Sequence, residues 1–249
     1  MAPISDIRRR ESAPALLPGP ARRIAVVLTC CCAVIVTVGA VLAAGRSEPY
    51  ALNRPVDSWI QGHIGAHHMA LQFISDLGVL GAELTAVALA LVALARRRRN
   101  LAALALISAP LAWGLTEFIL KPLVAERIDN FFTYPSGHTQ AVFCVATIMA
   151  VAALHPARAA PPTWLRVVLV AIAVAVGIAV AISMIGLNYH YFTDTVAGAA
   201  TGIGVALGTA LGLDTPRARR ALGDRRHDTG EAVTSDANCS RPPARPARS

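Results

Sequence analysis

The chain has 249 residues, of which 55% are hydrophobic and 15% charged, and its formal net charge is +8. So many apolar residues with so few charges exclude an ordinary soluble protein and indicate a membrane protein. The arginines cluster at the two ends and between apolar runs, as in the cytoplasmic flanks of membrane proteins. The positive charge therefore does not point to a nucleic-acid partner.

Residues 1–23 are rich in Arg, Pro and Ala and show no apolar periodicity, which predicts a disordered basic arm. The next 21 residues, 24–44, carry no charge and are long enough to span a bilayer as a helix. Arginine before this run and Ala43-Ala44-Gly45 after it would also suit a cleaved signal peptide. The run exceeds the usual apolar core of a signal, so an uncleaved anchor is favoured.

Residues 45–76 are of mixed polarity, and Trp59 among scattered apolar residues predicts a short interfacial helix. His63, His67 and His68 have ligand-like spacing on a helix face, but no acid or cysteine partner lies nearby, so we interpret them as surface residues. The cysteines show neither metal nor disulfide spacing and are interpreted as small apolar residues. They are Cys30, Cys31, Cys32, Cys144 and Cys239.

Residues 77–95 and 101–120 are the second and third predicted spans. A carboxylate inside a span is expensive and is a functional hypothesis by default. Glu83, in the second span, has no evident partner. Glu117, in the third, lies one helical turn before Lys121, which predicts an ion pair that orients the lysine.

Three more spans are predicted at 139–154, 167–185 and 195–213. The last contains glycines at four-residue spacing, which allow close helix packing. They are Gly198, Gly202, Gly204, Gly208 and Gly212. Residues 214–249 are polar and basic, and we predict a disordered tail. The sequence therefore predicts an all-α polytopic membrane protein whose domain, residues 24–213, is a bundle of six transmembrane helices.

Six spans place both termini on the same side of the membrane. Of the 23 Lys and Arg residues, 19 fall on that side, and four fall on the other: Arg46, Arg54, Lys121 and Arg127. The positive-inside rule therefore predicts cytoplasmic termini in a cell-membrane protein. The polar segments 121–138 and 183–194 then emerge together on the extracytoplasmic face, because a single helical hairpin separates them.

The first of these segments ends in Tyr-Pro-Ser-Gly-His at 134–138, directly before an apolar run where a helix is expected to begin. A helix start offers unpaired N–H groups to an anion. Gly137 lets the backbone approach a ligand closely, Ser136 can donate a hydroxyl, and His138 can hold a proton near neutral pH. These features predict a seat for a phosphate group.

The second segment contains His190 and Asp194, four residues apart. If the chain is helical there, the carboxylate can reach one ring nitrogen of the histidine. The other ring nitrogen is then free to act as a nucleophile or a base.

Taken together, Lys121, the Pro-Ser-Gly-His run and the spacing of Ser183, His190 and Asp194 resemble the three signature motifs of the type 2 phosphatidic acid phosphatase family, the lipid phosphate phosphatases of the haloperoxidase-like superfamily. The resemblance covers roughly residues 50–213, and three motifs in order are far more specific than Pro-Ser-Gly-His alone. It implies a membrane-embedded phosphatase that needs neither metal nor cofactor.

The resemblance also implies roles for individual residues. His190 would attack phosphorus and form a phosphohistidine, with Asp194 fixing its tautomer and stabilising the imidazolium. His138 would protonate the leaving oxygen and then activate water. The phosphoryl oxygens would be held by a wider set of groups: Lys121, Arg127, Ser136, Gly137 and Ser183.

Two positions depart from the family pattern. The first motif usually has arginine seven residues after its lysine, where this chain has Ile128, and Arg127 lies one residue early. The third motif usually has arginine after its serine, where this chain has Met184. Because an arginine contact to phosphate is charge-assisted and bidentate, each loss is expected to cost about 1.5 to 3 kcal/mol of binding.

The favoured hypothesis is an integral membrane phosphatase acting on a membrane lipid phosphate or diphosphate, of phosphatidate or polyprenyl type, at the extracytoplasmic face. The alternative is a catalytically weak or inactive protein of the same fold that binds or transports lipid phosphates, which the two missing arginines favour. A vanadate-dependent oxidase of the related superfamily is disfavoured by the six spans and the arginine-poor site.

Overall fold

The computed structural model describes residues 15–154 and 161–223 and is almost entirely helical there. Its helices are α1 (Gly19–Ala43), α2 (Asn53–Ile64), α3 (His68–Ala95), α4 (Arg99–Leu115), the π-helical turn η1 (Thr116–Leu120), α5 (Lys121–Val124), α6 (Gly137–Ala153), α7 (Thr163–Gly186), α8 (Phe192–Leu213) and α9 (Pro216–Gly223). Two short strands, β1 (Arg127–Ile128) and β2 (Phe131–Phe132), form an antiparallel hairpin. The predicted all-α class is confirmed, with this hairpin as a small addition.

Within the described part of the chain, five helical segments are long and apolar enough to cross a membrane: α1, α3, the continuous stretch Arg99–Val124, α7 and α8. These segments fit a multi-pass membrane protein. The helix α6, also apolar, has 17 residues. At about 1.5 Å per residue it is roughly 25 Å long, shorter than the hydrocarbon core of about 30 Å. The sixth span therefore stays a prediction for α6.

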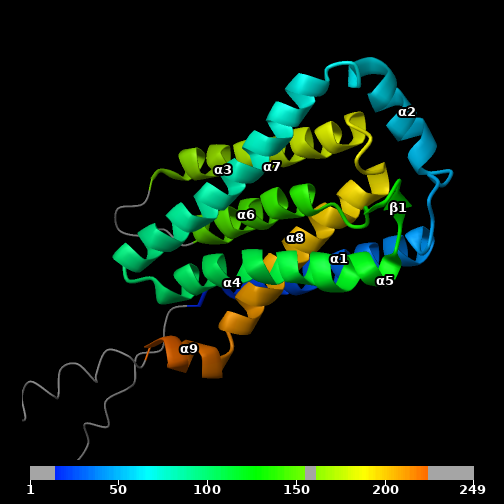
Figure 1. Ribbon diagram of the computed structural model, residues 1–249. Helices are drawn as coiled ribbons and strands as arrows, with labels where there is room; N and C mark the ends of the chain where they lie inside the picture. Colours follow the sequence, from blue (N-terminus) through cyan, green and yellow to red (C-terminus); the bar gives the residue numbers. More distant parts are fainter. Residues whose placement is uncertain (1–14, 155–160, 224–249) are drawn as a thin grey trace, which may run out of the picture.

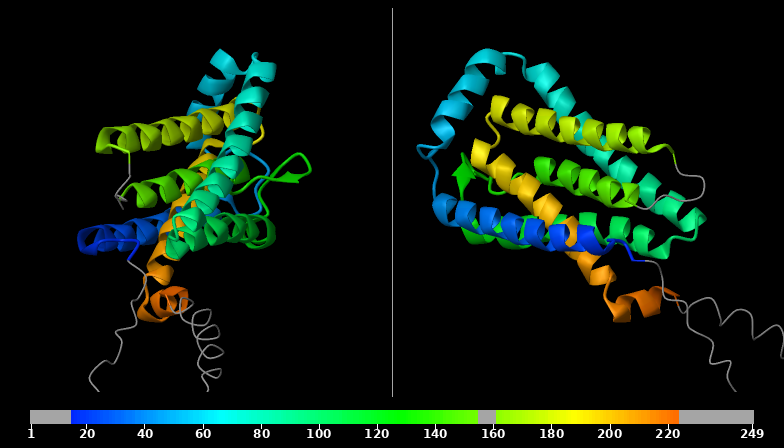
Figure 2. Two further views of the ribbon diagram at one scale, coloured as in Figure 1. Left: turned by 90° about the vertical axis from the view of Figure 1, so that its left-hand side faces the viewer. Right: turned by 180° about the vertical axis from the view of Figure 1, so that it is seen from behind.

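The long helices run side by side as a bundle, with α8 crossing it obliquely (Figures 1 and 2). The helix α2 and the β1–β2 hairpin lie at one end of the bundle, and α9 lies at the other. The end with α2 also holds the α7–α8 turn and the start of α6. The two polar segments of the sequence are therefore found at the same end of the bundle, as expected.

Close packing of α6 against α8 forms the centre of the bundle. A Cβ atom on Gly198 would collide with the Ser136 carbonyl oxygen, and one on Gly202 would collide with the Gln140 carbonyl oxygen. The glycines thus let the two backbones touch, which is the packing role predicted for them. In contrast, a Cβ atom on Gly212, at the far end of α8, would meet nothing within 4 Å.

The ordered region extends further than the sequence predicted at both ends. The helix α1 begins at Gly19, inside the expected arm 1–23, and α9 lies inside the expected tail 214–249. The reason is a buried carboxylate, Asp214, which accepts hydrogen bonds from the N–H groups of Leu16 (2.5 Å) and Leu17 (2.8 Å). The remainder of both predicted segments, 1–14 and 224–249, lies outside the described residues.

The interfacial helix expected in 45–76 corresponds to α2, whose Trp59 is exposed and stacks on His63 with ring centroids 4.6 Å apart. His63, His67 and His68 are all exposed, as interpreted from the sequence. The π-helical turn η1 and the hairpin were not predicted. The hairpin turn is permitted by Asp129, which adopts a positive φ of 54°, a conformation that Asp tolerates better than most residues.

Gly202→Ala is expected to destabilise the protein by about 1 to 3 kcal/mol, because the added methyl group must push α6 away from α8. Gly212→Ala, in the same helix, is the matched control. It is expected to be neutral or slightly stabilising, since alanine favours helix by up to about 1 kcal/mol over glycine. Thermal unfolding of both variants in detergent measures the difference, and equal melting temperatures would contradict the packing argument.

Candidate active site

The start of α6 is held in place from two sides. Ser136 is the N-cap residue, and its hydroxyl lies 3.5 Å from the Thr139 N–H. Tyr134, just before it, is fully buried and donates a hydrogen bond of 2.6 Å to the Val36 carbonyl of α1. The first N–H groups of α6, those of Gly137 and His138, have no partner within the helix and can bind an anion.

His190 lies in the tight turn between α7 and α8. The turn is made possible by Asn188, which ends α7 in the left-handed conformation at φ 58°. Asp194, in the first turn of α8, accepts a hydrogen bond of 3.0 Å from the Tyr191 N–H and caps the helix. The same carboxylate oxygen, Oδ2, lies 3.6 Å from Nδ1 of His190. The pairing predicted from the four-residue spacing is therefore present, with the other ring nitrogen, Nε2, turned away from the carboxylate.

The two histidine segments are joined by a backbone hydrogen bond. The N–H of Ser136 donates to the carbonyl of Asp194 at 3.0 Å. His138, two residues further along, lies within electrostatic range of His190. The structure thus brings together two histidines that are 52 residues apart in the sequence.

Lys121 and Glu117 form the ion pair expected from the sequence, with 2.6 Å between Nζ and Oε1. Glu117 lies on η1 and Lys121 at the start of α5. The π-helical turn is closed by a hydrogen bond from the Lys121 N–H to the Thr116 carbonyl. The pair lies beside the start of α6, since a Cβ atom on Gly137 would be 3.3 Å from Glu117 Oε1. Both charged groups also act on His138. A lysine, two histidines and a helix start therefore share one site.

Three of the predicted phosphate-binding side chains have other contacts. The hydroxyl of Ser136 is buried and serves as the α6 cap. The hydroxyl of Ser183 is engaged within α7, where it donates to the Ala179 carbonyl at 2.8 Å. Arg127 is exposed on the hairpin, and its guanidinium lies 4.7 Å from the centre of the Phe132 ring. Of the groups expected to bind phosphate, Lys121 and the first N–H groups of α6 therefore remain beside His138.

The position of Met184 explains one departure from the family pattern. Its side chain is 1% exposed and belongs to an apolar cluster with Leu71, Val142 and Val180. Its sulfur lies 3.9 Å from the Ser75 hydroxyl. An arginine here would bury a charge among apolar side chains, which is costly without a partner. The packing around position 184 therefore matches methionine. The side chain at this position belongs to the apolar core and does not face the candidate site.

The sequence analysis missed two side chains of α2 that hold the start of α8. Asp57 accepts a hydrogen bond of 2.9 Å from the Phe192 N–H, and Asn53 accepts one of 3.2 Å from the Thr193 N–H. Burial, together with the nearby charge of Asp194, raises the pKa of Asp57 to about 6. With Asp194 on the Tyr191 N–H, the first N–H groups of α8 are occupied, so α6 is the helix start that remains open to an anion.

A third residue that the sequence did not indicate is Glu126, between α5 and the hairpin. It is 1% exposed, and its carboxyl group faces that of Asp194. No pattern in the sequence marks Glu126 as buried, because it lies in a polar segment between Ala125 and Arg127. Among the described residues, no group of three or more His, Cys, Asp or Glu side chains is placed to hold a metal ion.

The chemistry open to this site follows from its groups. Nε2 of His190 can act as a nucleophile, because Nδ1 of the same ring faces the buried carboxylate of Asp194. His138 can donate and accept a proton, and Lys121 with the α6 N–H groups can neutralise an anion. The arrangement suits attack on an anionic centre with a poor leaving group.

Comparison with family models gives one match, to the PAP2 superfamily, over residues 116–217. The matched stretch contains the ion pair, the start of α6 and the His190–Asp194 turn. Comparison with curated proteins and with solved structures gave no match.

Asp57→Ala is expected to lower the free energy of unfolding by about 1 to 2 kcal/mol, because it removes a side-chain cap from α8. Ser58→Ala is the control, since Ser58 is exposed on the same helix. Melting temperatures in detergent at pH 7 measure both. A loss of stability that is equal in the two variants would contradict the capping role.

Proposed function

We propose that the protein is an integral membrane phosphatase that hydrolyses a lipid phosphate or diphosphate, because residues 116–217 match the model of the PAP2 superfamily, whose members are phosphatases. The observation that carries the proposal is the juxtaposition of His190, paired with Asp194, and His138 beside Lys121. A nucleophile, a proton donor and a positive charge are what hydrolysis of a phosphate ester requires.

In the first step, Nε2 of His190 attacks the terminal phosphorus, and the bond from that phosphorus to the leaving oxygen breaks; this oxygen is the lipid oxygen of a monophosphate or the bridging oxygen of a diphosphate. Protonated His138 gives its proton to the leaving oxygen, which departs as an alcohol or, from a diphosphate, as a lipid monophosphate. The carboxylate of Asp194, whose Oδ2 lies 3.6 Å from Nδ1 of His190, stabilises the imidazolium that forms. The product of this step is a phosphohistidine.

In the second step, neutral His138 takes a proton from water as the water oxygen attacks phosphorus. The phosphorus–nitrogen bond breaks, phosphate leaves, and His190 returns to its starting form. The ammonium of Lys121 and the N–H groups of Gly137 and His138 neutralise the phosphoryl oxygens in both steps. The helix α5, which begins at Lys121, and the start of α6, at Gly137, lie at the same end of the bundle.

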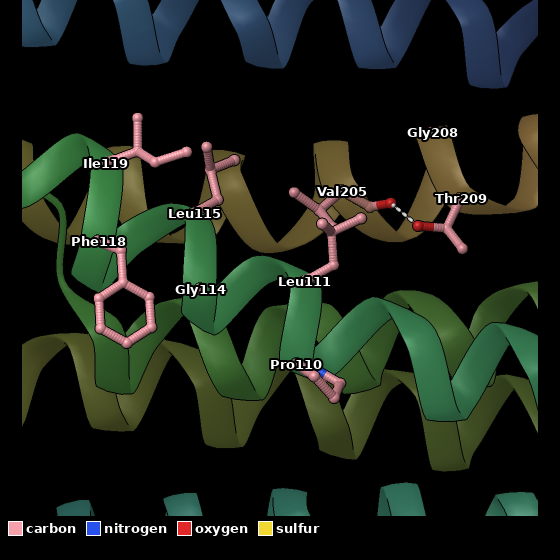
Figure 3. Close-up of a pocket in the computed structure, with 9 residues that line it drawn as sticks. All are labelled: Pro110, Leu111, Gly114, Leu115, Phe118, Ile119, Val205, Gly208 and Thr209. Atoms are coloured by element: carbon pink, nitrogen blue, oxygen red, sulfur yellow. Dashed lines mark hydrogen bonds between the residues drawn. The ribbon is translucent and has the colours of Figure 1, made fainter.

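An apolar groove supports a lipid substrate. A cavity of about 570 Å³ runs along the outside of the bundle between α4, η1 and α8 (Figure 3). Its wall is formed by Pro110, Leu111, Gly114, Leu115, Phe118, Ile119, Val205, Gly208 and Thr209. At one end of the groove, on the left in Figure 3, Phe118 and Ile119 directly follow Glu117, the partner of Lys121. A lipid chain lying in this groove would have its headgroup close to the lysine.

The proposal also includes an orientation. Cytoplasmic termini follow from the distribution of Lys and Arg residues along the sequence. The end of the bundle with α2, the hairpin and the histidines is then extracytoplasmic, opposite to α9. The substrate phosphate would be reached from the outer leaflet.

The second candidate function is a lipid-phosphate binder or transporter with little catalysis. It is favoured by the contacts that Lys121 and Arg127 already make. The ammonium of Lys121 is 2.6 Å from the Glu117 carboxylate, and Arg127 lies over Phe132 on the hairpin. Both cations are thus already partnered, which weakens the electrostatic attraction that transition-state stabilisation needs.

His190→Ala is expected to reduce phosphate release by on the order of 10³-fold or more, because the nucleophile is lost. The measurement is phosphate release by purified protein in detergent with EDTA, from phosphatidate, lysophosphatidate and a polyprenyl diphosphate. Release in EDTA by the unchanged protein is expected, since the proposed steps use side chains alone. His63→Ala, at an exposed histidine on α2, is the control and should retain full activity.

Phosphate release that survives His190→Ala would contradict the phosphohistidine step. If the folded, unchanged protein releases phosphate from none of these lipids but binds them, the binding function replaces the phosphatase.

A single cysteine at Asp129, in the hairpin turn, is expected to react with a membrane-impermeant maleimide in intact cells, because the hairpin belongs to the proposed outer end. A cysteine at Thr215, before α9, should react only after the membrane is opened. Both are placed in a variant whose native cysteines are replaced. The reverse labelling pattern would overturn the orientation.

A further inference from the structure

Glu126 is a buried acid outside the membrane-spanning segments. It lies between α5 and β1, with an exposed fraction of 1%. The loop closes around it: the Thr133 N–H donates to its carbonyl at 3.1 Å, and the Thr133 hydroxyl donates to its carboxyl oxygen Oε2 at 3.5 Å. The second carboxyl oxygen, Oε1, has no partner from these contacts.

The group opposite Glu126 is the carboxyl group of Asp194, which is 0% exposed. Of its oxygens, Oδ2 receives the Tyr191 N–H and faces His190, while Oδ1 is buried without a donor. Two ionised carboxylates can only accept hydrogen bonds and repel each other. A proton on Glu126, donated to Asp194, would satisfy both unpartnered oxygens at once.

The surrounding charges favour this protonated form. Burial first, and then the charge of Asp194, raises the pKa of Glu126 from 4.5 to about 9. The cation that acts on Glu126 is the exposed Arg46, in the loop after α1. The other titratable groups that interact with it are Tyr134 before α6 and Tyr50 and Tyr191, all of whose pKa values are raised by burial. Asp57 of α2 adds further negative charge near Asp194.

We propose that Glu126 is a positioning residue for His190: its protonated carboxyl group donates a hydrogen bond to Oδ1 of Asp194 and so fixes the rotation of the carboxylate that faces the imidazole. The proposal deepens the proposed function, on which its catalytic consequence rests. It assigns to the loop after α5 a second task besides carrying the family's first motif.

The consequence for His190 is geometric and electrostatic. A carboxylate with both oxygens engaged cannot rotate, so Oδ2 stays directed at Nδ1 of His190, and Nε2 keeps its lone pair for attack. The buried pair carries one negative charge in total. Loss of the Glu126 proton would give the pair two negative charges. Their repulsion would move the Asp194 carboxylate away from Glu126 and disturb His190.

Glu126→Gln tests the proposal, because its amide can donate to Asp194 and accept from Thr133 with nearly unchanged shape. We expect kcat at pH 7 to stay within about 3-fold of the unchanged protein, and Glu126→Ala to lower kcat on the order of 10-fold or more with little change in KM. Glu48→Gln, at an exposed acid on the same end of the bundle, is the control.

The pH dependence separates positioning from a merely structural role. The ratio of kcat in Glu126→Gln to kcat in the unchanged protein should be flat below pH 8 and rise near pH 9, because only the unchanged protein can lose the proton. Taking the ratio removes the titration of His138, which both proteins share. A ratio that is flat to pH 10, or a Glu126→Gln variant as impaired as Glu126→Ala, would overturn the proposal.

A readout that needs no activity distinguishes failure of this proposal from failure of the proposed function. The ¹⁵N imidazole signals of His190, assigned with His190→Gln, should shift with a midpoint near pH 9 in the unchanged protein and not in Glu126→Gln. If no variant releases phosphate, the phosphatase fails while this titration still decides on the Glu126–Asp194 bond. Absence of the shift in the unchanged protein would overturn the proposal.

The stability of the protein gives a further check. As the pH rises from 4.5 to 9, the unfolded state loses the Glu126 proton while the folded state keeps it, so the free energy of unfolding falls. Glu126→Gln lacks this loss, and its melting temperature should exceed that of the unchanged protein by an amount that grows over this range. A difference independent of pH would show that Glu126 is ionised in the fold.

Discussion

The candidate site depends on the close approach of α6 and α8. Two helix backbones can touch only where a residue has no side chain, and on α8 these residues are Gly198 and Gly202. The contact places the Ser136 N–H on the Asp194 carbonyl, so the start of α6 and the start of α8 are joined at the same end of the bundle. Two polar segments that are remote in the sequence become one site, and neither helix can shift along the other without breaking that bond.

Negative charge dominates the region behind His190. Asp57, Glu126 and Asp194 surround the start of α8, and the positive end of that helix offsets part of their repulsion. Burial and the remaining repulsion raise the pKa of Asp57 to about 6 and that of Glu126 to about 9, so Glu126 and not Asp57 is the acid that retains a proton at pH 7. In front of His190 the balance is reversed, with Lys121 and the open start of α6. The imidazole therefore lies between a carboxylate that orients it and a surface that can receive an anion.

The two departures from the family pattern have different structural meanings. Met184 is part of the apolar core, so an arginine at position 184 alone would be buried among apolar side chains and would not restore a phosphate contact. Ile128 lies in a short hairpin whose neighbour Arg127 packs on Phe132. Because neither position supplies an arginine to the site around His190, the side-chain cation left to attract a phosphate there is Lys121. Its ammonium group is also paired with the Glu117 carboxylate.

The sequence by itself determined the helices and the ion pair of Glu117 with Lys121, because these depend on apolar runs and on a spacing of four residues within a helix. The approach of His190 to Asp194 was also expected from a four-residue spacing, but His190 lies in the turn before α8 begins at Phe192, so the turn and not a helix brings the two together. It also located the start of α6 through Pro-Ser-Gly-His. Only the tertiary structure decided that Ser183 and Met184 face inward and that Asp57 and Glu126 come to Asp194 from other elements. Those contacts join residues 68 to 137 positions apart, and no local periodicity encodes a meeting of that kind.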